Sequence, residues 1–223
     1  MCLGTNVYVC CFGASSRWLC RDALTSLGST GENGEHAGDE VYAVVFDAGS
    51  TGSRVHVIKF MKTASGLQLL EDTFDHIKPG LGDEGWKDEP ERAAASLQPL
   101  IDIAIAAVPE AQQGRTPVEL RATAGLRLLG EAKSKRILEA VTKLLENSPF
   151  MLVPDGVTVM DGIDEGAYAW LTLNYLLGKT GKPANDLVGA IDLGGGSVQQ
   201  AFAVDDATAK SAPTGVYFAR SEK

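Results

Sequence analysis

The chain has 223 residues and a formal net charge of −9, with 44% hydrophobic and 22% charged residues. This length allows a sizeable core, and the ordinary balance of apolar and charged residues excludes a chain that is disordered throughout. The negative charge argues against nucleic acid as a partner, because nucleic-acid binding depends on Lys and Arg contacts to phosphates.

The start of the chain differs in composition from the rest. All four cysteines lie within the first twenty residues, which are mildly apolar but lack a basic start and a long apolar run. This segment is therefore a poor signal peptide and is too short to span a bilayer. Residues 21–39 are rich in Gly, Ser and acidic side chains, as flexible linkers are. We expect residues 1–40 to be a disordered N-terminal extension, with a leader or membrane anchor as the alternative.

Three strands are predicted next. Residues 41–46 form an apolar, β-branched run that is typical of a buried central strand, and residues 55–60 return as its partner after a short loop. Residues 67–74 give a third strand after a turn. Because these strands follow one another directly, we expect them to form a meander.

Helices alternate with strands in the rest of the chain. Apolar residues recur at helical spacing over residues 89–108, 133–146 and 165–177. Short strands are predicted between these helices at residues 118–123 and 157–160. The order β-β-β-α-β-α-β-α implies an α/β fold with a mixed sheet, in which helical crossovers join the later strands.

Two stretches of the chain share one plan, in which a strand is followed by an Asp, a loop rich in Gly, Ser or Thr, and a second strand. The first stretch is centred on Asp47, and the second, over residues 187–204, on Asp192. Backbone N–H groups can converge on an anion in such a loop, because glycine adds no Cβ to block close approach. The carboxylate offers a hard oxygen ligand for a divalent cation. Two copies predict two facing lobes that hold one polyphosphate between them.

Four segments resemble the first four conserved regions of the apyrase family, the nucleoside triphosphate diphosphohydrolases. They are DAGSTGSR (47–54), RATAGLRLL (121–129), DGIDEGAYAWLTLNYLLG (161–178) and IDLGGGSVQQAF (191–202). KPGLGD (78–83) also resembles the KPGL segment of this family. The resemblance implies a ribonuclease-H-like lobe of the actin, sugar kinase and heat-shock-chaperone ATPase superfamily, in which two such lobes face each other across a nucleotide cleft. Residues 41–183 would form the first lobe, and residues 184–223 the start of a truncated second lobe.

The resemblance also implies roles for individual residues. Asp47 and Asp192 would orient a Ca²⁺ or Mg²⁺ ion through its water shell, and Glu165 would be the general base that takes a proton from the attacking water. Ser197 and Gln199 would hold that water. The implied phosphate-binding residues are Gly49, Ser50, Thr51, Gly52, Ser53, Arg54, Thr123, Gly194, Gly195, Gly196 and Ser197.

Simpler structural interpretations are open for several of these residues. The loop after Asp47 is compatible with an ordinary hairpin turn, and Glu165 with a residue that only stabilises the start of a helix. Where the family usually has Thr after the second loop, this chain has Val198, which removes a hydroxyl. The aromatic residues on the helix after Glu165 are predicted to pack in the core rather than to stack on a base; they are Tyr168, Trp170 and Tyr175.

The function that the resemblance implies is metal-assisted hydrolysis of nucleoside tri- and diphosphates such as ATP and ADP, with release of inorganic phosphate by direct attack of water. The alternative is a truncated, catalytically inactive relative that still binds phosphate or another ligand. Proteins of this family lie in the secretory pathway, in membranes or outside the cell, and the N-terminus here shows no clear anchor.

Overall fold

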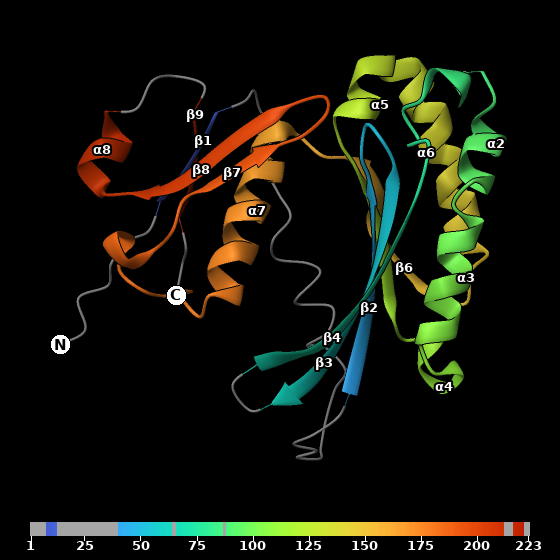
Figure 1. Ribbon diagram of the computed structural model, residues 1–223, viewed down its shortest axis with the longest axis horizontal. Coiled ribbons are helices and arrows are strands. Elements are labelled where there is room, and N and C mark those ends of the chain that lie inside the picture. The colour runs from blue at the N-terminus through green and yellow to red at the C-terminus, as the bar shows by residue number, and fades with distance from the viewer. Residues whose placement is uncertain (1–7, 13–39, 64–65, 87, 212–215, 221–223) are drawn as a thin grey trace. The chain divides into compact units, whose positions relative to one another are not determined.

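The computed structural model divides the chain into two compact units (Figure 1), each of which is described by itself. The larger unit is Trp18–Val159, and the smaller unit combines Met1–Arg17 with Met160–Lys223. Among the described residues, no helix combines the length and the apolar character that a membrane span requires. The structure describes residues 8–12, 40–63, 66–86, 88–211 and 216–220.

The larger unit is built on a five-stranded mixed sheet with the strand order β4-β3-β2-β5-β6. Three strands pair antiparallel and form the predicted meander; they are β2 (Glu40–Ala48), β3 (Ser53–Thr63) and β4 (Gly66–Ile77). Two further strands pair parallel, β5 (Pro117–Ala122) with β2 and β6 (Met151–Val159) with β5. This arrangement confirms the predicted α/β class with a mixed sheet.

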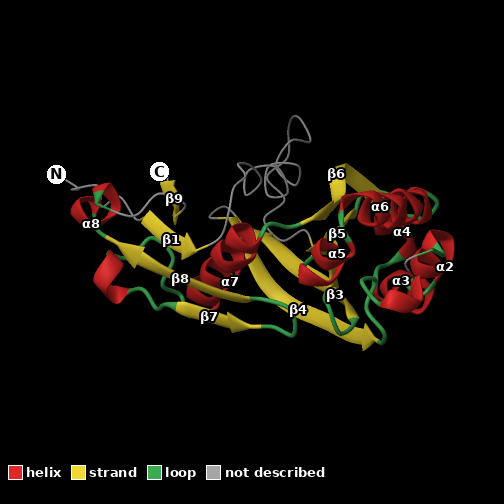
Figure 2. Cartoon of the chain, turned by 90° about the horizontal axis from the view of Figure 1, so that it is seen from above, coloured by secondary structure: helices red, strands yellow, loops and turns green. Residues whose placement is uncertain are grey.

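Helices cover one face of this sheet, as Figures 1 and 2 show. After the short 3-10 helix η1 (Glu84–Trp86) they are α2 (Pro90–Ala95), α3 (Gln98–Ala107), α4 (Glu110–Gln113), α5 (Ala124–Leu129) and α6 (Glu131–Glu146). Alternate residues of the strands and the apolar faces of the helices form one core. Phe46, Leu120 and Ile137 are fully buried in it. The core therefore holds the ends of β2 and β5 in place, where the candidate site begins.

The single helix predicted over residues 89–108 is wrong, because the chain forms α2 and α3 there. Pro99 has no N–H to donate four residues back, so a continuous helix would lose a hydrogen bond at this point. The Ser96 hydroxyl donates instead to the Ala93 carbonyl at 2.6 Å and ends α2. Leu97 lies in the break and is fully buried, so the interruption costs no core packing.

Strand β6 begins at Met151, earlier than the strand predicted at residues 157–160. The intervening Pro-Asp-Gly sequence is typical of a turn, but here it lies inside the strand as an irregularity. Asp155 has a φ of 52°, and the register with β5 shifts between Val118 and Leu120. The turn residues therefore produce a bulge rather than the end of the strand.

The smaller unit contains a four-stranded sheet with the order β7-β8-β1-β9. β7 (Ala190–Leu193) and β8 (Val198–Val204) form the predicted antiparallel hairpin. β1 (Tyr8–Phe12) pairs antiparallel with β8 and with β9 (Val216–Arg220). The unit is completed by α7 (Gly162–Leu176), the 3-10 helix η2 (Ala184–Asp186) and α8 (Asp206–Lys210).

Helix α7 is fixed to the β7–β8 hairpin by apolar packing and by one buried amide. Ile163 and Trp170 pack against Ala201 of β8. Asn174 is 1% exposed, and its Nδ2 donates to the Val188 carbonyl at 3.1 Å while its Oδ1 accepts from the Val188 N–H at 3.0 Å. These contacts set the position of the start of α7 relative to β8.

The aromatic residues of α7 bear out the core-packing prediction in part. Trp170 is buried in the cluster with Ile163, as predicted, and Tyr168 is half-buried. Tyr175 is 43% exposed, so the prediction is wrong for this residue. It lies in the last turn of the helix, one residue after the buried Asn174, and therefore faces away from the sheet.

Two expectations about the ends of the units need correction. Residues 8–12 form a strand, so the expected disorder does not hold there; an apolar run with two aromatic residues suits a sheet position between two strands. The rest of residues 1–39 lies outside the described residues. The units divide at residue 159 because α7 packs on β7 and β8, whereas the expected boundary was residue 183. That residues 184–223 begin a truncated lobe stays a prediction.

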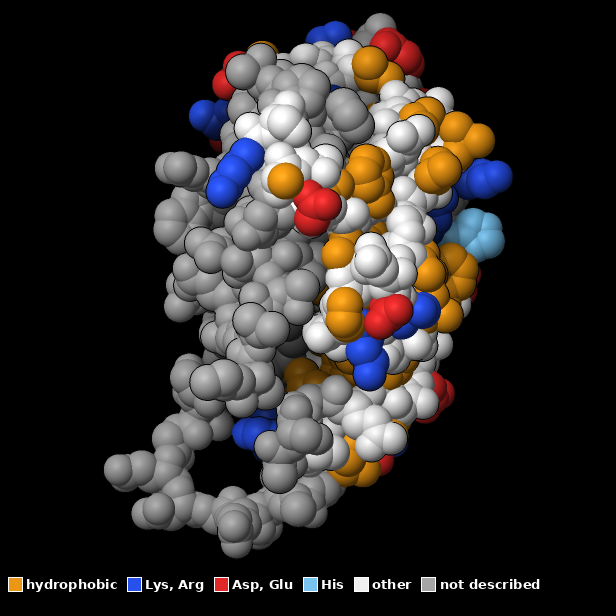
Figure 3. Space-filling view, turned by 90° about the vertical axis from the view of Figure 1, so that its left-hand side faces the viewer, with side chains coloured by type: hydrophobic (Ala, Val, Ile, Leu, Met, Phe, Trp, Pro, Cys, Tyr) orange, Lys and Arg blue, Asp and Glu red, His pale blue; other side chains and the backbone are white. Residues whose placement is uncertain are grey.

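One face of the β7–β8 hairpin is apolar and exposed. The exposed fractions are 79% for Leu193, 74% for Ile191 and 55% for Val198. In the space-filling view of Figure 3, hydrophobic side chains lie at the surface of the coloured residues, and charged side chains are scattered between them. In β8, Gln199 and Ala201 are buried and alternate with exposed residues such as Val198. Hence the hairpin turns its polar candidate-site residue toward α7.

Candidate functional site

The first loop (residues 49–52) is enclosed by neighbouring backbone. A Cβ on Gly52 would lie 2.6 Å from the Ile77 carbonyl oxygen, and one on Gly80 would lie 2.9 Å from the Gly52 nitrogen and collide with the Gly49 carbonyl oxygen. Gly49 and Gly52 are both buried, and neither has a φ in the left-handed region. Glycine is therefore needed here for close approach and not for a special φ.

A second set of close contacts joins the first loop to α5. A Cβ on Gly125 would lie 2.8 Å from the Ser50 Cα, and a Cβ on Gly82 would lie 2.6 Å from the Gly125 Cα. The Thr123 N–H also donates to the Ala48 carbonyl at 3.1 Å, directly before the loop. We call the five mutually contacting glycines the glycine cluster; they are Gly49, Gly52, Gly80, Gly82 and Gly125.

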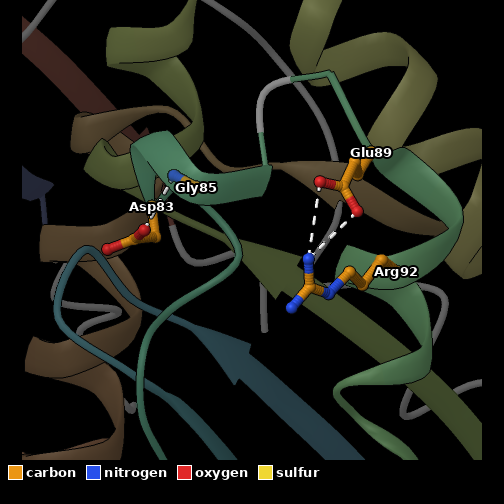
Figure 4. A network of polar contacts seen from close by, with 4 residues as sticks. All are labelled: Asp83, Gly85, Glu89 and Arg92. Atoms are coloured by element: carbon orange, nitrogen blue, oxygen red, sulfur yellow. Dashed lines mark hydrogen bonds and ion pairs between the residues drawn. The ribbon is translucent and has the colours of Figure 1, made fainter.

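The Gly80 loop (residues 78–83) is held by hydrogen bonds to the turn that follows it. The Asp83 N–H and the Trp86 Nε1–H both donate to the Gly80 carbonyl, each at 3.1 Å. Figure 4 shows that the Asp83 carboxylate in turn accepts from the Gly85 N–H, at 2.9 Å. Arg92 pairs with Glu89 in the same view and lies over the Trp86 ring, 5.3 Å from its centre. The Gly80 loop thus presents a fixed surface to the first loop.

The charged residues that flank the first loop neutralise each other. Arg54 Nη1 lies 2.9 Å from Asp47 Oδ2, and both side chains are somewhat more than one-third exposed. The pair joins adjacent strands, because Asp47 and Arg54 are directly opposite in the β2–β3 ladder. Arg54 is therefore engaged with the carboxylate and is not a free cation at this loop.

The hydroxyl groups of the first loop differ in their access to solvent. Thr51 is exposed and Ser50 is half-buried, so both are available to a ligand. Ser53 is 1% exposed, and within the described part of the chain its hydroxyl has no hydrogen-bond partner. Thr123 is half-buried at the start of α5. Of the predicted phosphate-binding hydroxyls in the larger unit, Ser50, Thr51 and Thr123 are thus accessible to solvent and Ser53 is not.

In the smaller unit, Glu165, Ser197 and Gln199 lie together. Gln199 is 4% exposed, and its Nε2 lies 2.8 Å from Ser197 Oγ and 3.4 Å from Glu165 Oε2. The other amide atom of Gln199, Oε1, is buried and has no partner among the described residues. A buried acceptor without a partner is costly, so this atom marks a position where a hydrogen-bond donor would be favourable.

The start of α7 is capped by Asp161 and not by Glu165. Asp161 Oδ1 accepts from the Ile163 N–H at 3.0 Å, and the Asp161 carbonyl accepts from the Glu165 N–H at 3.0 Å. Glu165 lies in the first turn, where the helix dipole favours a negative charge. Because Asp161 makes the cap, Glu165 is not the N-cap, and stabilisation through the helix dipole is the structural role that its position leaves open.

The second loop (residues 194–196) is more open than the first. All three glycines are exposed, and the loop is closed by the Gly194 N–H, which donates to the Ser197 carbonyl at 3.0 Å. Asp192 stands opposite Gln199 in the β7–β8 ladder and is half-buried. No ion pair of Asp192 is found within the described ranges. Whether Asp47 and Asp192 face one crevice stays a prediction, since they belong to different units.

Sequence reasoning missed part of this arrangement. The contacts of Gly80, Gly82 and Gly125 join segments that are far apart in the chain, although glycines within the KPGLGD and RATAGLRLL segments were a signal of close packing. The cap by Asp161 was readable from the sequence, because an Asp directly before a helix is a common N-cap.

Comparison with known proteins decides which family the chain belongs to. The GDA1/CD39 (nucleoside phosphatase) family matches residues 33–218. The chain belongs to this family. The family resemblance inferred from the sequence motifs is thereby confirmed.

Curated GDA1/CD39-type relatives are similar over most of this chain. Probable apyrase 2 from Oryza sativa subsp. japonica is 51% identical over 175 residues, which cover 77% of this chain and 37% of that protein. The guanosine-diphosphatase of Candida albicans is 45% identical over 196 residues, which cover 86% of this chain and 32% of that protein. The chain therefore spans about a third of the length of these relatives.

A solved structure supports the fold of this GDA1/CD39 chain. The crystal structure of nucleoside triphosphate hydrolases from Neospora caninum aligns with a TM-score of 0.55 at 21% sequence identity. The alignment covers 81% of this chain and 43% of that one. It confirms the predicted fold class.

Proposed function

We propose that this chain hydrolyses nucleoside tri- and diphosphates to lower phosphates and inorganic phosphate. The observation that carries the proposal is the cluster of Glu165, Ser197 and Gln199, in which Gln199 Oε1 accepts no hydrogen bond from any residue that the structure describes. Membership of the GDA1/CD39 (nucleoside phosphatase) family supports the reaction class. Relatives that bear the names apyrase, nucleoside-triphosphatase and guanosine-diphosphatase support a nucleoside phosphate as substrate.

The cluster can position and activate a water molecule. Gln199 Nε2 donates toward Ser197 and Glu165, which fixes the amide so that Oε1 is left to accept a hydrogen bond from the water. The Glu165 carboxylate then takes a proton from the same water as it attacks the terminal phosphorus. Such positioned proton transfer contributes roughly 10² to 10⁴-fold to a rate. The groups offered for phosphate binding are the hydroxyls of Ser50 and Thr51 in the larger unit and the backbone of the second loop in the smaller unit.

A divalent cation, Ca²⁺ or Mg²⁺, fits this chemistry through water-mediated contacts. Within the described residues no three His, Cys, Asp or Glu side chains gather as direct ligands would. Asp192 has no ion-pair partner among the described residues, and Asp47 retains one oxygen beyond its contact with Arg54. Mg²⁺ usually keeps several waters and binds substrate phosphates, so it needs only one or two carboxylates from a protein. When bound, the ion neutralises charge on the phosphate oxygens.

The proposal is tested by measuring phosphate release from ATP and from ADP, with and without added Mg²⁺ or Ca²⁺, for the wild-type chain and for Glu165→Gln. We expect metal-dependent release that falls at least about 100-fold in the variant, because the base is lost while shape and hydrogen bonding are retained. Glu146→Gln, which changes an exposed glutamate at the end of α6, is the matched control.

Two outcomes would contradict the proposal. Equal release by the wild type and Glu165→Gln would remove Glu165 from the mechanism. Nucleotide binding without turnover under any metal condition would favour the alternative, a relative that binds phosphate without hydrolysing it.

A further inference from the structure

Lys78 lies against the first loop. It follows the last residue of β4 and begins the Gly80 loop, and its Cγ is 3.4 Å from the position that a Cβ on Gly52 would occupy. The carbonyl of the preceding residue, Ile77, contacts Gly52 as well. The Lys78 side chain is therefore adjacent to Gly52, the last residue of the first loop.

The positive charge of Lys78 is not compensated within the described part of the chain. Its side chain is exposed and makes no hydrogen bond or ion pair there. Arg54, a second cation beside the first loop, is paired with Asp47 at 2.9 Å. In a chain with a net charge of −9, an anion that approaches the loop meets few uncompensated cations. Lys78 is one of them, and it stands at the edge of the loop.

The backbone that carries Lys78 is held in place. Gly80 is buried against Gly49 and Gly52, and its carbonyl accepts from Trp86 Nε1 and from the Asp83 N–H. Because the backbone is already ordered, binding a ligand would cost mainly the rotamer freedom of one side chain. A ligand at the loop would therefore meet Lys78 on a backbone that needs no rearrangement.

We propose that the Lys78 ammonium group binds the phosphate held at the first loop and thereby sets the affinity for the substrate. This rests on the proposed function. A lysine ammonium donates charge-assisted hydrogen bonds to phosphate oxygens as a compact point charge. Since it contacts phosphate and not the base, its contribution is the same for ATP and for GTP. It acts on the bound substrate and on the transition state alike, so it changes KM and leaves kcat unchanged.

The test compares Lys78→Gln and Lys78→Arg with Lys62→Gln. Lys62 is an exposed lysine of the same sheet, near the other end of β3 and roughly 30 Å from the first loop at about 3.3 Å per strand residue. Two readouts are needed: KM and kcat for ATP and GTP, and the Kd for a non-hydrolysable ATP analogue at low and high salt. Thermal unfolding shows whether each variant is folded.

We expect Lys78→Gln to raise KM and Kd about tenfold with kcat unchanged, as the loss of one hydrogen bond from a charged group predicts. The effect is equal for ATP and GTP and shrinks at high salt, because salt screens exposed charges. Lys78→Arg retains most of the affinity, and Lys62→Gln resembles the wild type.

The results separate this inference from the function on which it rests. If the wild type hydrolyses ATP but Lys78→Gln binds and turns over like Lys62→Gln, the role of Lys78 is overturned and the proposed function stands. A fall in kcat at unchanged KM also overturns it. If the wild-type chain neither hydrolyses ATP nor binds the analogue, the proposed function and the role of Lys78 fail together.

Discussion

The two loops that follow Asp47 and Asp192 are alike in sequence and differ in surroundings. The first loop is buried among the backbone atoms of the glycine cluster, and its aspartate is neutralised by Arg54. The second loop is exposed and is closed by one backbone hydrogen bond, and no cation pairs with Asp192 within the described residues. A shared sequence plan therefore specifies the turn but not how firmly the turn is held.

This difference suggests a division of work. The first loop is rigid before any ligand arrives, because neighbouring backbone leaves it no room to move. The second loop follows Asp192, which pairs with no cation among the described residues, and it lies beside the Glu165 cluster, so this region supplies charge and chemistry. Rigid elements position groups accurately, whereas uncompensated charges bind metal and phosphate. Substitutions at matched positions in and around the two loops test whether they differ in this way.

The largest effect on stability is expected from Gly82→Ala. The new methyl group would collide with the Gly125 backbone, and overpacking of this kind costs about 3 kcal/mol. Gly194→Ala in the second loop should cost less than about 1 kcal/mol, since its Cβ would lie 3.2 Å from a single carbonyl oxygen. Thermal and urea unfolding measure both. Gly114→Ala is the control, because a Cβ there meets nothing within 4 Å. Similar unfolding midpoints for Gly82→Ala and Gly194→Ala would show that the first loop is not packed more tightly than the second.

The next effect is on activity and not on stability, and it is expected from Gln199→Met. The substitution keeps the length of the side chain and removes an acceptor that has no partner in the described structure, so stability should hold. Turnover should fall about 100-fold, as it does when one positioned polar group is removed from an active site. Gln200→Met, at the exposed neighbouring position of β8, is the matched control. A Gln199→Met variant with wild-type turnover would exclude this amide from the positioning of water.

The smallest of these effects concerns the metal. Asp192→Asn should raise the half-saturating Mg²⁺ concentration about tenfold, a usual effect for groups that act on a metal through water. Asp47→Asn should raise it less, because Arg54 already neutralises that carboxylate. Phosphate release measured across a Mg²⁺ titration tests both, with the exposed Asp186→Asn as the control. A larger effect at Asp47 than at Asp192 would show that the carboxylate before the first loop contributes more to metal binding, which is the opposite of the expected order.

Much of the fold was predictable, because the sheet and helices follow local patterns. Alternating and β-branched runs located β2, β3 and β5, and helical periodicity located α6 and α7. The predicted element bounds were wrong where a residue that usually ends an element has a different role in this structure. A Pro-Asp-Gly sequence formed a bulge inside β6, and Pro99 started a second helix within an apolar pattern that otherwise continued.

The sequence indicated which residues belong to the candidate site, but it did not indicate all of the contacts that they make. The resemblance to the apyrase family named Glu165, Ser197 and Gln199 as site residues. The structure brings them together because the helix and the hairpin that carry them pack directly. The burial of Ser53 and the pairing of Arg54 with Asp47 depend on side-chain packing around the loop. Local sequence does not encode that packing, so the expected phosphate cradle was broader than the set of groups that solvent reaches.

The glycine cluster also limits how this protein can be redesigned. Backbone atoms make the contacts between three segments, residues 49–52, 78–83 and 123–125. Backbone atoms cannot move aside as the end of a flexible side chain can, so a change in one segment affects the others. A chimera that takes one of them from a relative would have to take all three to preserve their fit. The three segments therefore behave as one exchangeable part, although the chain brings them from widely separated positions.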